Sequence, residues 1–317
     1  MPQPTRAQVH IDAILTNISI AYRQAQTAFV ASRVFPVIPV DKPSNRYFVF
    51  DQNNWFLDAM ERRPPATESA GSGYTLSTDN YSCDVYALHK DIPDQIRESA
   101  DLPLNPDRNA TQWLTQMALM KLEIQWQTDY FATGVWATDA TISNKWDTFA
   151  SSDPILDIRT GIRTILANTG FMANSLVLGF DVWNKLQDHP DITDRMKITD
   201  DKITTPALLA RILNIDNVYI CQGIKSTTRE GAATPAYDFI MGKHALLCYA
   251  APAPALEMPS AGYTFMWTGI SGGLGADVGV SSFRLDHLRV DRVEIEAAWD
   301  NKVVSRPLGY FMPNAVT

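Results

Sequence analysis

A stretch of 25 residues without glycine or proline constrains this chain more than any other segment. It runs from Asp107 to Phe131 and follows Asn105 and Pro106, a pair typical of a helix start. Its apolar side chains repeat at helical spacing in two seams, Trp113, Met117, Met120 and Ile124 on one side and Leu119, Leu122, Trp126 and Tyr130 on the other. The pattern predicts a spine helix roughly 37 Å long that is covered on two sides along its whole length.

The segment from 44 to 92 has the features of a long hairpin with almost no core of its own. Strand-forming residues run from Arg46 to Phe50 and again from Tyr81 to His89. The residues between them include Pro64 and Pro65 and several glycines. A two-stranded excursion of this length is marginal in water, so we expect a neighbouring surface to support it.

The first 43 residues are expected to form an arm. Phe35 to Val40 is apolar, but Pro36 and Pro39 each remove a backbone donor and exclude a central strand. We therefore expect an extended segment that lies over another surface and needs neighbours to hold it.

The remaining chain alternates helix and strand signals, and the fold class is predicted as α+β. Asp153 and Pro154 start a helix that Gly170 ends. A buried strand is expected at Ser175–Phe180. Further strands are expected at Val218–Cys221, Phe239–Met241 and Ala245–Tyr249, long alternating strands over Phe283–Ala298, and helices that begin at Asp181 and at Pro206. We also expect a glycine loop at Gly269–Gly279, a turn at Asp300–Asn301 and a returning strand at Lys302–Met312. The regions so defined are 1–43, 44–92, 93–151 with its spine helix at about 107–131, 152–258 and 259–317.

Composition and charge exclude several classes of protein. The 317 residues carry a formal net charge of -8, which argues against an affinity built on neutralising phosphates. Cys83, Cys221 and Cys248 are far apart and odd in number, which favours reduced thiols over a disulfide framework or a zinc site. The most apolar stretch, Ala245 to Leu256, is too short and too proline-rich to span a bilayer. No signal-peptide pattern follows Met1.

No constellation of residues meets the requirements of catalysis, so we expect no catalytic, cofactor-binding or metal-binding residues. Gly273–Gly279 has the wrong spacing for a dinucleotide motif and no helix pattern after it. His189, Pro190, Asp191 and Asp194 suggest a polar helix end and a turn, because a further ligand at metal-site spacing is lacking. Ser and Cys nucleophile motifs are absent from the sequence. The remaining acidic candidates are expected on solvated strand faces, namely Asp286, Asp291, Glu294 and Glu296.

The order of these pieces resembles the major capsid protein family of tailed phages, which has the HK97-like fold. The resemblance covers nearly the whole chain and rests on four stretches, Arg33–Val40 with Tyr47 and Phe48, Asn174–Gly179, Asp188–Pro190 with Ile192, and Val293–Ile295 with Gly309–Phe311. It implies an N-terminal arm at 1–43, an E-loop at 44–92 and a peripheral domain at 93–151. It further implies an axial domain at 152–258 and a β-rich return through both domains at 259–317.

The resemblance also implies a function and partners. The chain would assemble with itself, as hexamers and pentamers, into an icosahedral virion shell that forms in a bacterial cytoplasm and holds double-stranded DNA weakly. A separate scaffolding protein, a portal and decoration proteins would be its partners, and no membrane is involved. Some members cross-link through an E-loop lysine, but no lysine lies between Pro43 and His89 here, and Lys42 and Lys90 only flank the loop. A non-covalent shell is therefore expected.

Two alternatives remain open on the sequence alone. An encapsulin-like nanocompartment shell shares the fold and would hold a cargo enzyme instead of DNA. A soluble α/β enzyme with residues 152–258 as its catalytic domain would lack a nucleophile, a metal and a cofactor site.

Overall fold

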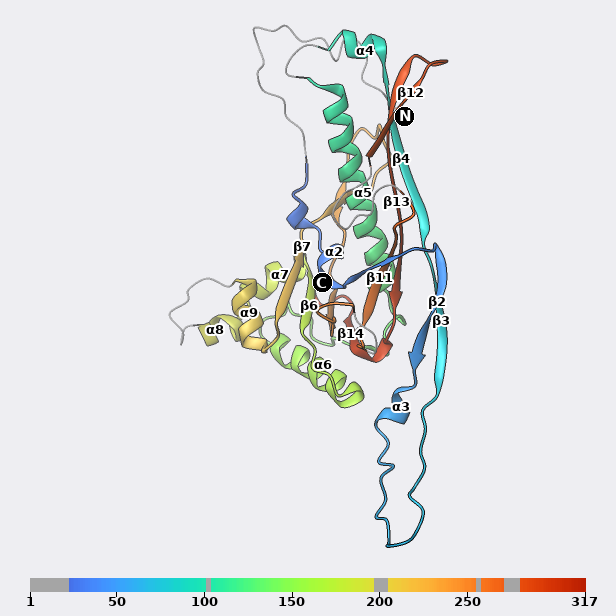
Figure 1. Cartoon of the computed structure of the whole chain (residues 1–317). Coiled ribbons are helices and arrows are strands. Elements are labelled where there is room, and N and C mark those ends of the chain that lie inside the picture. The colour runs from blue at the N-terminus through green and yellow to red at the C-terminus, as the bar shows by residue number, and fades with distance from the viewer. Residues whose placement is uncertain (1–22, 101–103, 197–204, 255–257, 271–279) are drawn as a thin grey trace.

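The molecule is elongated, with a long helix beside a long sheet, a lobe of shorter helices to one side and a projecting hairpin (Figure 1). The computed structural model describes residues 23–100, 104–196, 205–254, 258–270 and 280–317. The glycine loop expected at Gly269–Gly279 lies outside these residues from Ser271 onward, as does the arm up to residue 22.

The long helix α5 spans Pro106–Tyr130, as the sequence predicts. The side chain of Asn105 accepts a hydrogen bond from the Arg108 amide, so it caps the first turn. The helix lies on a sheet with strand order β1 (Val37–Val40), β11 (Gly262–Trp267), β13 (Val290–Val303) and β12 (Val280–Leu285), and β4 (Asp84–Pro93) pairs with β13. Ala110 and Leu114 of the helix pack against Ile92, Val293 and Ile295 of this sheet.

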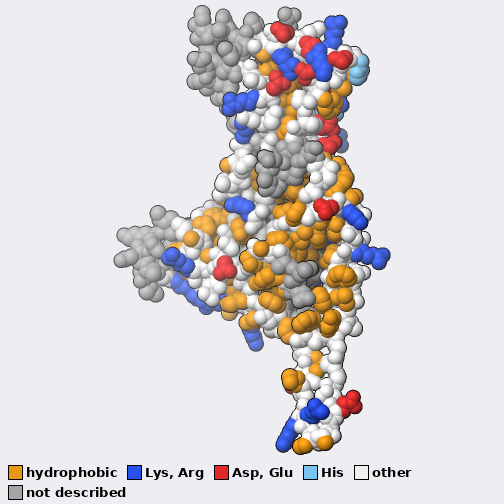
Figure 2. Space-filling view, viewed as in Figure 1, with side chains coloured by type: hydrophobic (Ala, Val, Ile, Leu, Met, Phe, Trp, Pro, Cys, Tyr) orange, Lys and Arg blue, Asp and Glu red, His pale blue; other side chains and the backbone are white. Residues whose placement is uncertain are grey.

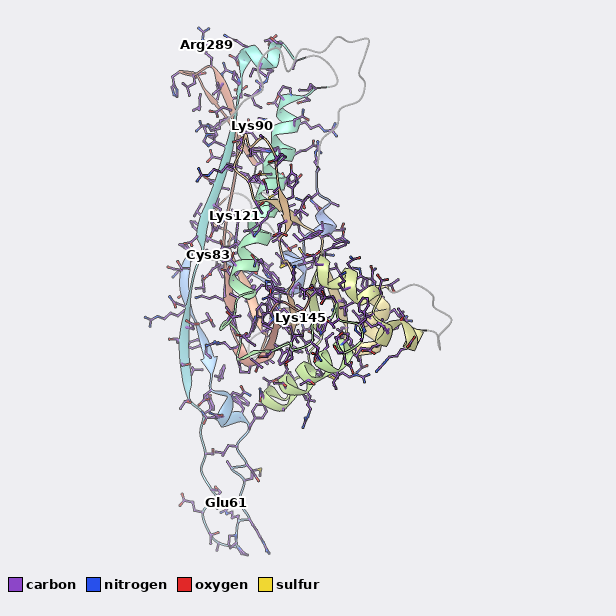
Figure 3. The ribbon with its side chains drawn as sticks, turned by 180° about the vertical axis from the view of Figure 1, so that it is seen from behind. Glu61, Cys83, Lys90, Lys121, Lys145 and Arg289 are labelled. Carbon is purple, nitrogen blue, oxygen red and sulfur yellow. The ribbon has the colours of Figure 1, made fainter. Side chains whose placement is uncertain are left out.

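The two apolar seams of α5 have different surroundings, so the expectation of cover along the whole helix is wrong. Leu122, Trp126 and Tyr130 of one seam are buried in the main core. Trp113 of the other seam is 39% exposed, and the Lys90 ammonium lies 5.7 Å from its ring centroid. Lys90 and Lys121 both lie between β4 and α5 (Figure 3). Among the described residues, the long sheet packs against the side of this half of the helix that carries Ala110 and Leu114, and Trp113 stays partly exposed.

A second sheet forms the core of the lobe, with strand order β5 (Thr138–Asp139), β14 (Gly309–Met312), β10 (Ala245–Cys248), β6 (Ser175–Gly179) and β7 (Asn217–Cys221). The lobe's helices are α6 (Pro154–Thr169), α7 (Phe180–Gln187), α8 (Pro190–Met196) and α9 (Pro206–Leu213). The predicted ends of α6 are confirmed, because Asp153 caps the Leu156 amide and Gly170 has a φ of 74°. A small antiparallel hairpin, β8 (Ile224–Ser226) and β9 (Tyr237–Phe239), follows β7 in the chain.

The large hairpin consists of β2 (Ser44–Phe50) and β3 (Leu76–Ser82), with the short helix α3 (Gln52–Trp55) after β2. The single strand expected at Tyr81–His89 is therefore two strands. The Cys83 amide donates to the Pro43 carbonyl and closes the hairpin, and the chain then leaves it to pair with β13 as β4. Ten partners in β13 hold β4, which explains why it belongs to the long sheet and not to the hairpin.

The described part of the arm packs within its own chain, contrary to the expectation that it depends on neighbours. It contains η1 (Gln26–Ala28), α2 (Ala31–Val34) and the strand β1. Phe35 is buried against the rings of Trp126, Tyr130 and Trp136. Pro39 lies in β1, which is an edge strand parallel to β11, so its missing amide costs no pairing in the interior of the sheet.

The turn predicted at Asp300–Asn301 is wrong, because β13 continues through both residues. Asn301 accepts a hydrogen bond from the Thr264 hydroxyl and donates one to Asp129, and the Asp300 carboxylate accepts from the Ser82 amide. These partners satisfy two polar side chains inside a strand. The chain turns only afterwards, at η2 (Arg306–Leu308), before β14. The short helix α4 (Asp94–Glu98) follows β4 at the far end of the long sheet.

Candidate functional site: a projecting loop and its anchors

The loop between β2 and β3 projects beyond the body of the molecule and exposes large apolar side chains (Figures 1 and 2). Glu61 lies near its far end (Figure 3). Phe50, Trp55 and Tyr74 form a cluster of three rings whose centroids are 5.9–6.2 Å apart. Trp55 is 60% exposed, Tyr74 is 65% exposed and Met60 is 93% exposed. Apolar groups gathered in this way on a surface mark a place where another molecule binds.

The base of the loop is held by its own chain. The Asp51 carboxylate caps α3 by accepting from the Asn53 amide at 3.1 Å. The Gln52 side chain donates to the Asn168 carbonyl at the C-terminal end of α6. The Phe56 ring lies over Gly170, which follows that helix. Farther out in the loop, a Cβ added at Gly71 would meet no atom within 4 Å. The contacts of Gln52 and Phe56 thus hold the loop at its base.

The two strands of the hairpin are fixed to the long sheet by aromatic packing. The Tyr81 ring stacks on the Phe265 ring with centroids 4.6 Å apart, and the Tyr47 ring lies 5.5 Å from it. The Tyr47 hydroxyl donates to Asp79 at 2.9 Å. Burial and this carboxylate raise the pKa of Tyr47, so the hydroxyl keeps its proton and the bond persists at ordinary pH. The hairpin that carries the loop is therefore packed against the long sheet at its base.

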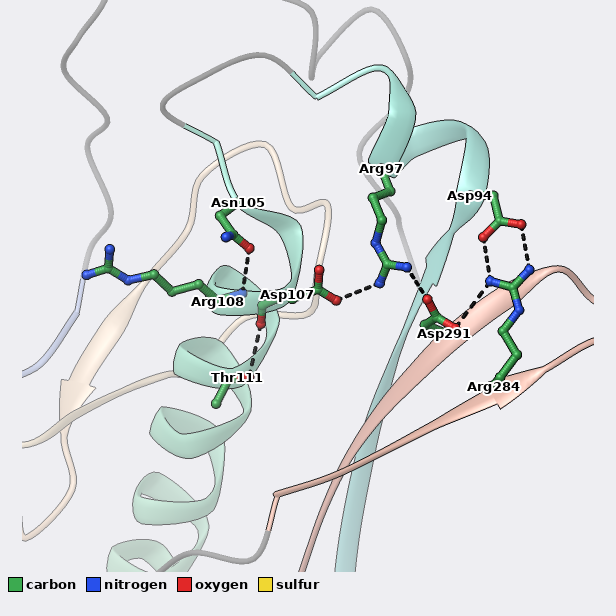
Figure 4. A network of polar contacts seen from close by, with 8 residues as sticks. All are labelled: Asp94, Arg97, Asn105, Asp107, Arg108, Thr111, Arg284 and Asp291. Carbon is green, nitrogen blue, oxygen red and sulfur yellow. Dashed lines mark hydrogen bonds and ion pairs between the residues drawn. The ribbon is translucent and has the colours of Figure 1, made fainter.

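Charged side chains gather at the opposite end of the molecule, around α4 and β12 (Figure 2). Arg284 forms two hydrogen bonds with Asp94, at 2.6 and 2.7 Å, and lies 3.2 Å from Asp291. Arg97 joins Asp291 to Asp107, the latter at 2.6 Å (Figure 4). The network ties α4, α5, β12 and β13 together. Asp291 was expected on a solvated face, but its side chain is only 19% exposed because two guanidinium groups cover it.

A serine, a histidine and an aspartate meet in the lobe, but their hydrogen bonds exclude a catalytic triad. The Asp191 amide donates to His189 Nδ1 at 3.2 Å, so Nε2 carries the proton and donates to Ser152 Oγ at 2.9 Å. The Ser152 hydroxyl donates in turn to the Thr148 carbonyl at 2.9 Å. A general base must accept the serine proton, and here the histidine is the donor. Burial also lowers the pKa of His189, which lies at the expected turn between α7 and α8 but is fully buried there.

The other residues considered as ligands or nucleophiles are dispersed. Across the described ranges, no three His, Cys, Asp or Glu side chains are placed to share a metal ion. Cys83, Cys221 and Cys248 are buried free thiols. Burial raises the pKa of Cys83 to about 11, so it is a poor nucleophile at neutral pH. Asp286 is exposed and lies 3.5 Å from Arg284.

The sequence patterns missed Glu123, a fully buried carboxylate in the middle of α5. Its oxygens accept hydrogen bonds from the Val30 and Ala31 amides and from the Cys221 thiol. Burial raises the pKa of Glu123 above the ordinary range of a glutamate, and these donors oppose that rise. A charged residue directly after Leu122 of the buried seam was the one signal that could have drawn attention to it.

Among the described helices, none combines the length and the hydropathy that crossing a membrane requires.

Two curated proteins are related to this chain at low identity, although no family model matches it. The major capsid protein of Burkholderia phage BcepMu is 23% identical over 75% of this chain and 76% of its own length. The major capsid protein of Pseudomonas phage JBD67 is 26% identical over 98% of this chain and 99% of its own length.

Solved structures share the fold over most of the chain. A phage-related protein from Bordetella bronchiseptica RB50 has a TM-score of 0.68 at 20% identity and covers 93% of both chains. The capsid of cyanophage P-SCSP1u has a TM-score of 0.61 at 9% identity, covering 95% of this chain and 92% of the other. A virus-like particle from Pyrococcus furiosus has a TM-score of 0.52 at 10% identity, covering 88% of this chain and 89% of the other.

Phage capsids are not the only structures with this fold, so the structural likeness alone does not separate the shell alternatives. The sequence relatives do favour one of them, because both are phage major capsid proteins. The enzyme alternative is wrong, since the family is structural and non-enzymatic. The chain belongs to the phage major capsid proteins of HK97-like fold and is a component of the virion head shell.

Proposed function

We propose that copies of this chain assemble as hexamers and pentamers into an icosahedral shell that encloses double-stranded DNA. The observation that carries this proposal is the projecting loop, where Trp55 and Tyr74 pack against each other and Phe50 yet remain 60% and 65% exposed. Burial of apolar area on a neighbouring copy would supply the missing core, at about 25 cal/mol per Å². A closed shell gives every such loop an equivalent neighbour.

The regions of the fold take the following roles in this proposal. Residues 1–43 are the N-terminal arm, and β2, β3 and their loop are the E-loop, which then spans 44–82 instead of 44–92. The peripheral domain contains α5 and the long sheet. The axial domain contains the second sheet with α6 to α9. The last residues, 259–317, return through both sheets as β11 to β14.

The shell is non-covalent in this proposal, because the E-loop has no lysine to form a cross-link. The net charge of -8 supports weak, non-specific contact with the packaged DNA. Assembly takes place in the bacterial cytoplasm with a separate scaffolding protein and a portal, and decoration proteins can join the outer surface.

The loop's role can be tested by removing its apolar groups. In the variant Trp55→Ser/Tyr74→Ser, both rings of the exposed cluster are lost while the body of the molecule is untouched. We expect the melting temperature of the unassembled chain to stay within about 2 °C of the parent, because exposed side chains contribute little to folding. We expect the yield of shells, counted by negative-stain microscopy after expression with the scaffold, to fall more than tenfold.

The matched control is Glu68→Ala/Ser72→Ala, which changes two residues of the same loop without removing apolar rings. It should form shells at the parent's yield. Normal shells from the double serine variant would contradict the proposal, as would a parent chain that forms no particle with its scaffold.

A further inference from the structure

The root of the arm, residues 24–35, lies between α5 and strand β7. On the β7 side, the Gln24 side chain forms two hydrogen bonds of 2.8 Å with the backbone of Ile224, and the Gln222 amide donates to Ala28 at 3.0 Å. On the α5 side, the Phe35 ring packs 4.8 Å from the Tyr130 ring. The root therefore separates the long helix from the edge of the second sheet.

One carboxylate joins all three of these elements. Glu123 of α5 accepts from the Val30 amide at 3.0 and 3.1 Å and from the Ala31 amide at 2.8 Å. It also accepts from the Cys221 thiol of β7 at 3.3 Å. The positive charge of Arg33 favours the charged form of Glu123, and the Arg33 guanidinium lies over the Tyr219 ring of β7.

This arrangement has two stable states, one with the arm root in place and one with the root released and the site filled with water. A partly released state between them is unfavourable. A buried carboxylate without donors is strongly unfavourable, and so are buried amides without acceptors. While the root is in place, the Val30 and Ala31 amides and Glu123 satisfy each other. If the root leaves, water must enter to solvate all of them. An intermediate position would leave these groups dry and unpaired, so the contact opens as a unit.

We propose that Glu123 is a latch that holds the arm root between α5 and β7, and that opening it exposes Cys221 while the surrounding cores stay folded. Only the purpose of the latch rests on the proposed function. In a shell, each subunit must adjust its arm and lobe to different neighbours, and opening the latch would allow this. The latch itself is a property of the single chain.

The test uses two variants of the latch. Glu123→Gln keeps one acceptor oxygen for the amides, whereas Glu123→Leu removes both. Each variant removes the negative charge that helps raise the pKa of Cys221, so a difference between them reports the lost acceptor and not a change in thiol chemistry. Both are made in the full chain in two backgrounds, one with Cys221 as the single cysteine and one with Cys248, with alanine at the other two cysteines.

The measurement is the rate of labelling of the unassembled chain by a neutral maleimide. We expect Cys221 to react at least about tenfold faster in Glu123→Leu than in Glu123→Gln, with the rate of Cys248 equal in the two. Equal rates at Cys221, or a parallel rise at Cys248, would overturn the latch, because the first means no opening and the second means general unfolding.

Amide hydrogen exchange gives a second measurement in the chain with all its cysteines, should the alanine backgrounds fold poorly. The Val30 and Ala31 amides should lose protection in Glu123→Leu, while those of β6 keep theirs. Unchanged protection at both positions would also overturn the proposal. All of these readouts use the unassembled chain, so a failure to form shells would reject the proposed function and leave the latch standing.

Discussion

At the scale of single residues, backbone contact decides which positions tolerate change. Gly179 is the last residue of β6, directly before α7, and a Cβ at this position would come within 1.9 Å of the Gly242 carbonyl oxygen. This neighbour is backbone and cannot swing away as a side chain would. Gly71, in the projecting loop, has open space instead. The two glycines thus make a matched pair.

We predict that Gly179→Ala destabilises the folded chain by about 1–3 kcal/mol, the usual range for an added group in a packed interior. Gly71→Ala should change the free energy of unfolding by less than about 0.5 kcal/mol. Urea unfolding of both variants checks the prediction, and equal midpoints for the two would show that the β6 backbone shifts at little cost.

The Ser152–His189 pair is the second case at this scale, where proximity suggests chemistry that the proton positions exclude. We predict that a fluorophosphonate probe does not label Ser152 at pH 7 to 8, because His189 Nε2 donates to the serine and burial keeps the ring neutral. Mass spectrometry of the treated chain gives the readout, with a known serine hydrolase as positive control. A probe adduct on Ser152 would refute the assignment of the tautomer.

At the scale of elements, the network around Arg284 shows how charges join pieces that are distant in sequence. Asp94 follows β4, Asp291 lies in β13 and Arg97 reaches Asp107 at the start of α5 (Figure 4). Hydrogen bonds from Arg284 and Arg97 lower the pKa of Asp94 and Asp291, respectively, below the ordinary value of 3.8. The network therefore fastens the end of the long sheet to the helix only while both carboxylates are charged.

The sign of the pH dependence follows from those lowered pKa values. The network's stabilisation is fully present above about pH 4, near the unfolded pKa of aspartate, and is lost as the pH falls through the lower folded values. We predict that the melting temperature drops between pH 5 and pH 2 by more in the parent than in Asp94→Asn, which has no charge there to lose. The two melting curves should differ at pH 7 and converge in acid. Parallel pH profiles would mean that solvent screens these exposed pairs completely.

At the scale of the whole molecule, the chain combines a body with a buried apolar core and a loop whose apolar side chains are exposed. The body has a continuous core from the arm root through α5 to the second sheet. The loop carries its apolar side chains away from that core (Figure 2). In the proposed shell, overlapping surfaces of such parts hold the copies together, so we expect its persistence to depend on many contacts breaking together.

We predict that mature particles boiled in detergent run as one band near 35 kDa, the mass of the single chain. The physical reason is that the E-loop has no lysine between Pro43 and His89 to form an isopeptide bond. Denaturing gel electrophoresis of purified particles gives the measurement. A ladder of multiples would contradict the non-covalent shell and direct attention to Lys42, just before the hairpin, and to lysines elsewhere, such as Lys90 within β4 of the long sheet.

The sequence by itself determined the elements whose signals are local. Asn105 and Pro106 start α5, Asp153 and Gly170 bound α6, and the apolar run at β6 is a buried strand, because capping and periodicity act within a few residues. The need of the hairpin for a supporting neighbour also rests on residue types alone, and it stays a prediction.

Only the tertiary structure decided the features that depend on partners distant in sequence. Asp300 and Asn301 have the composition of a turn, yet Ser82, Thr264 and Asp129 satisfy them inside β13. Glu123 is tolerated in a dry core because Val30, Ala31 and Cys221 bring donors to it. Trp113 belongs to an apolar seam yet stays partly exposed, because at this end of α5 the long sheet packs against Ala110 and Leu114 instead. In each case, the free energy of a side chain is set by what the fold brings beside it, and no local pattern contains that information.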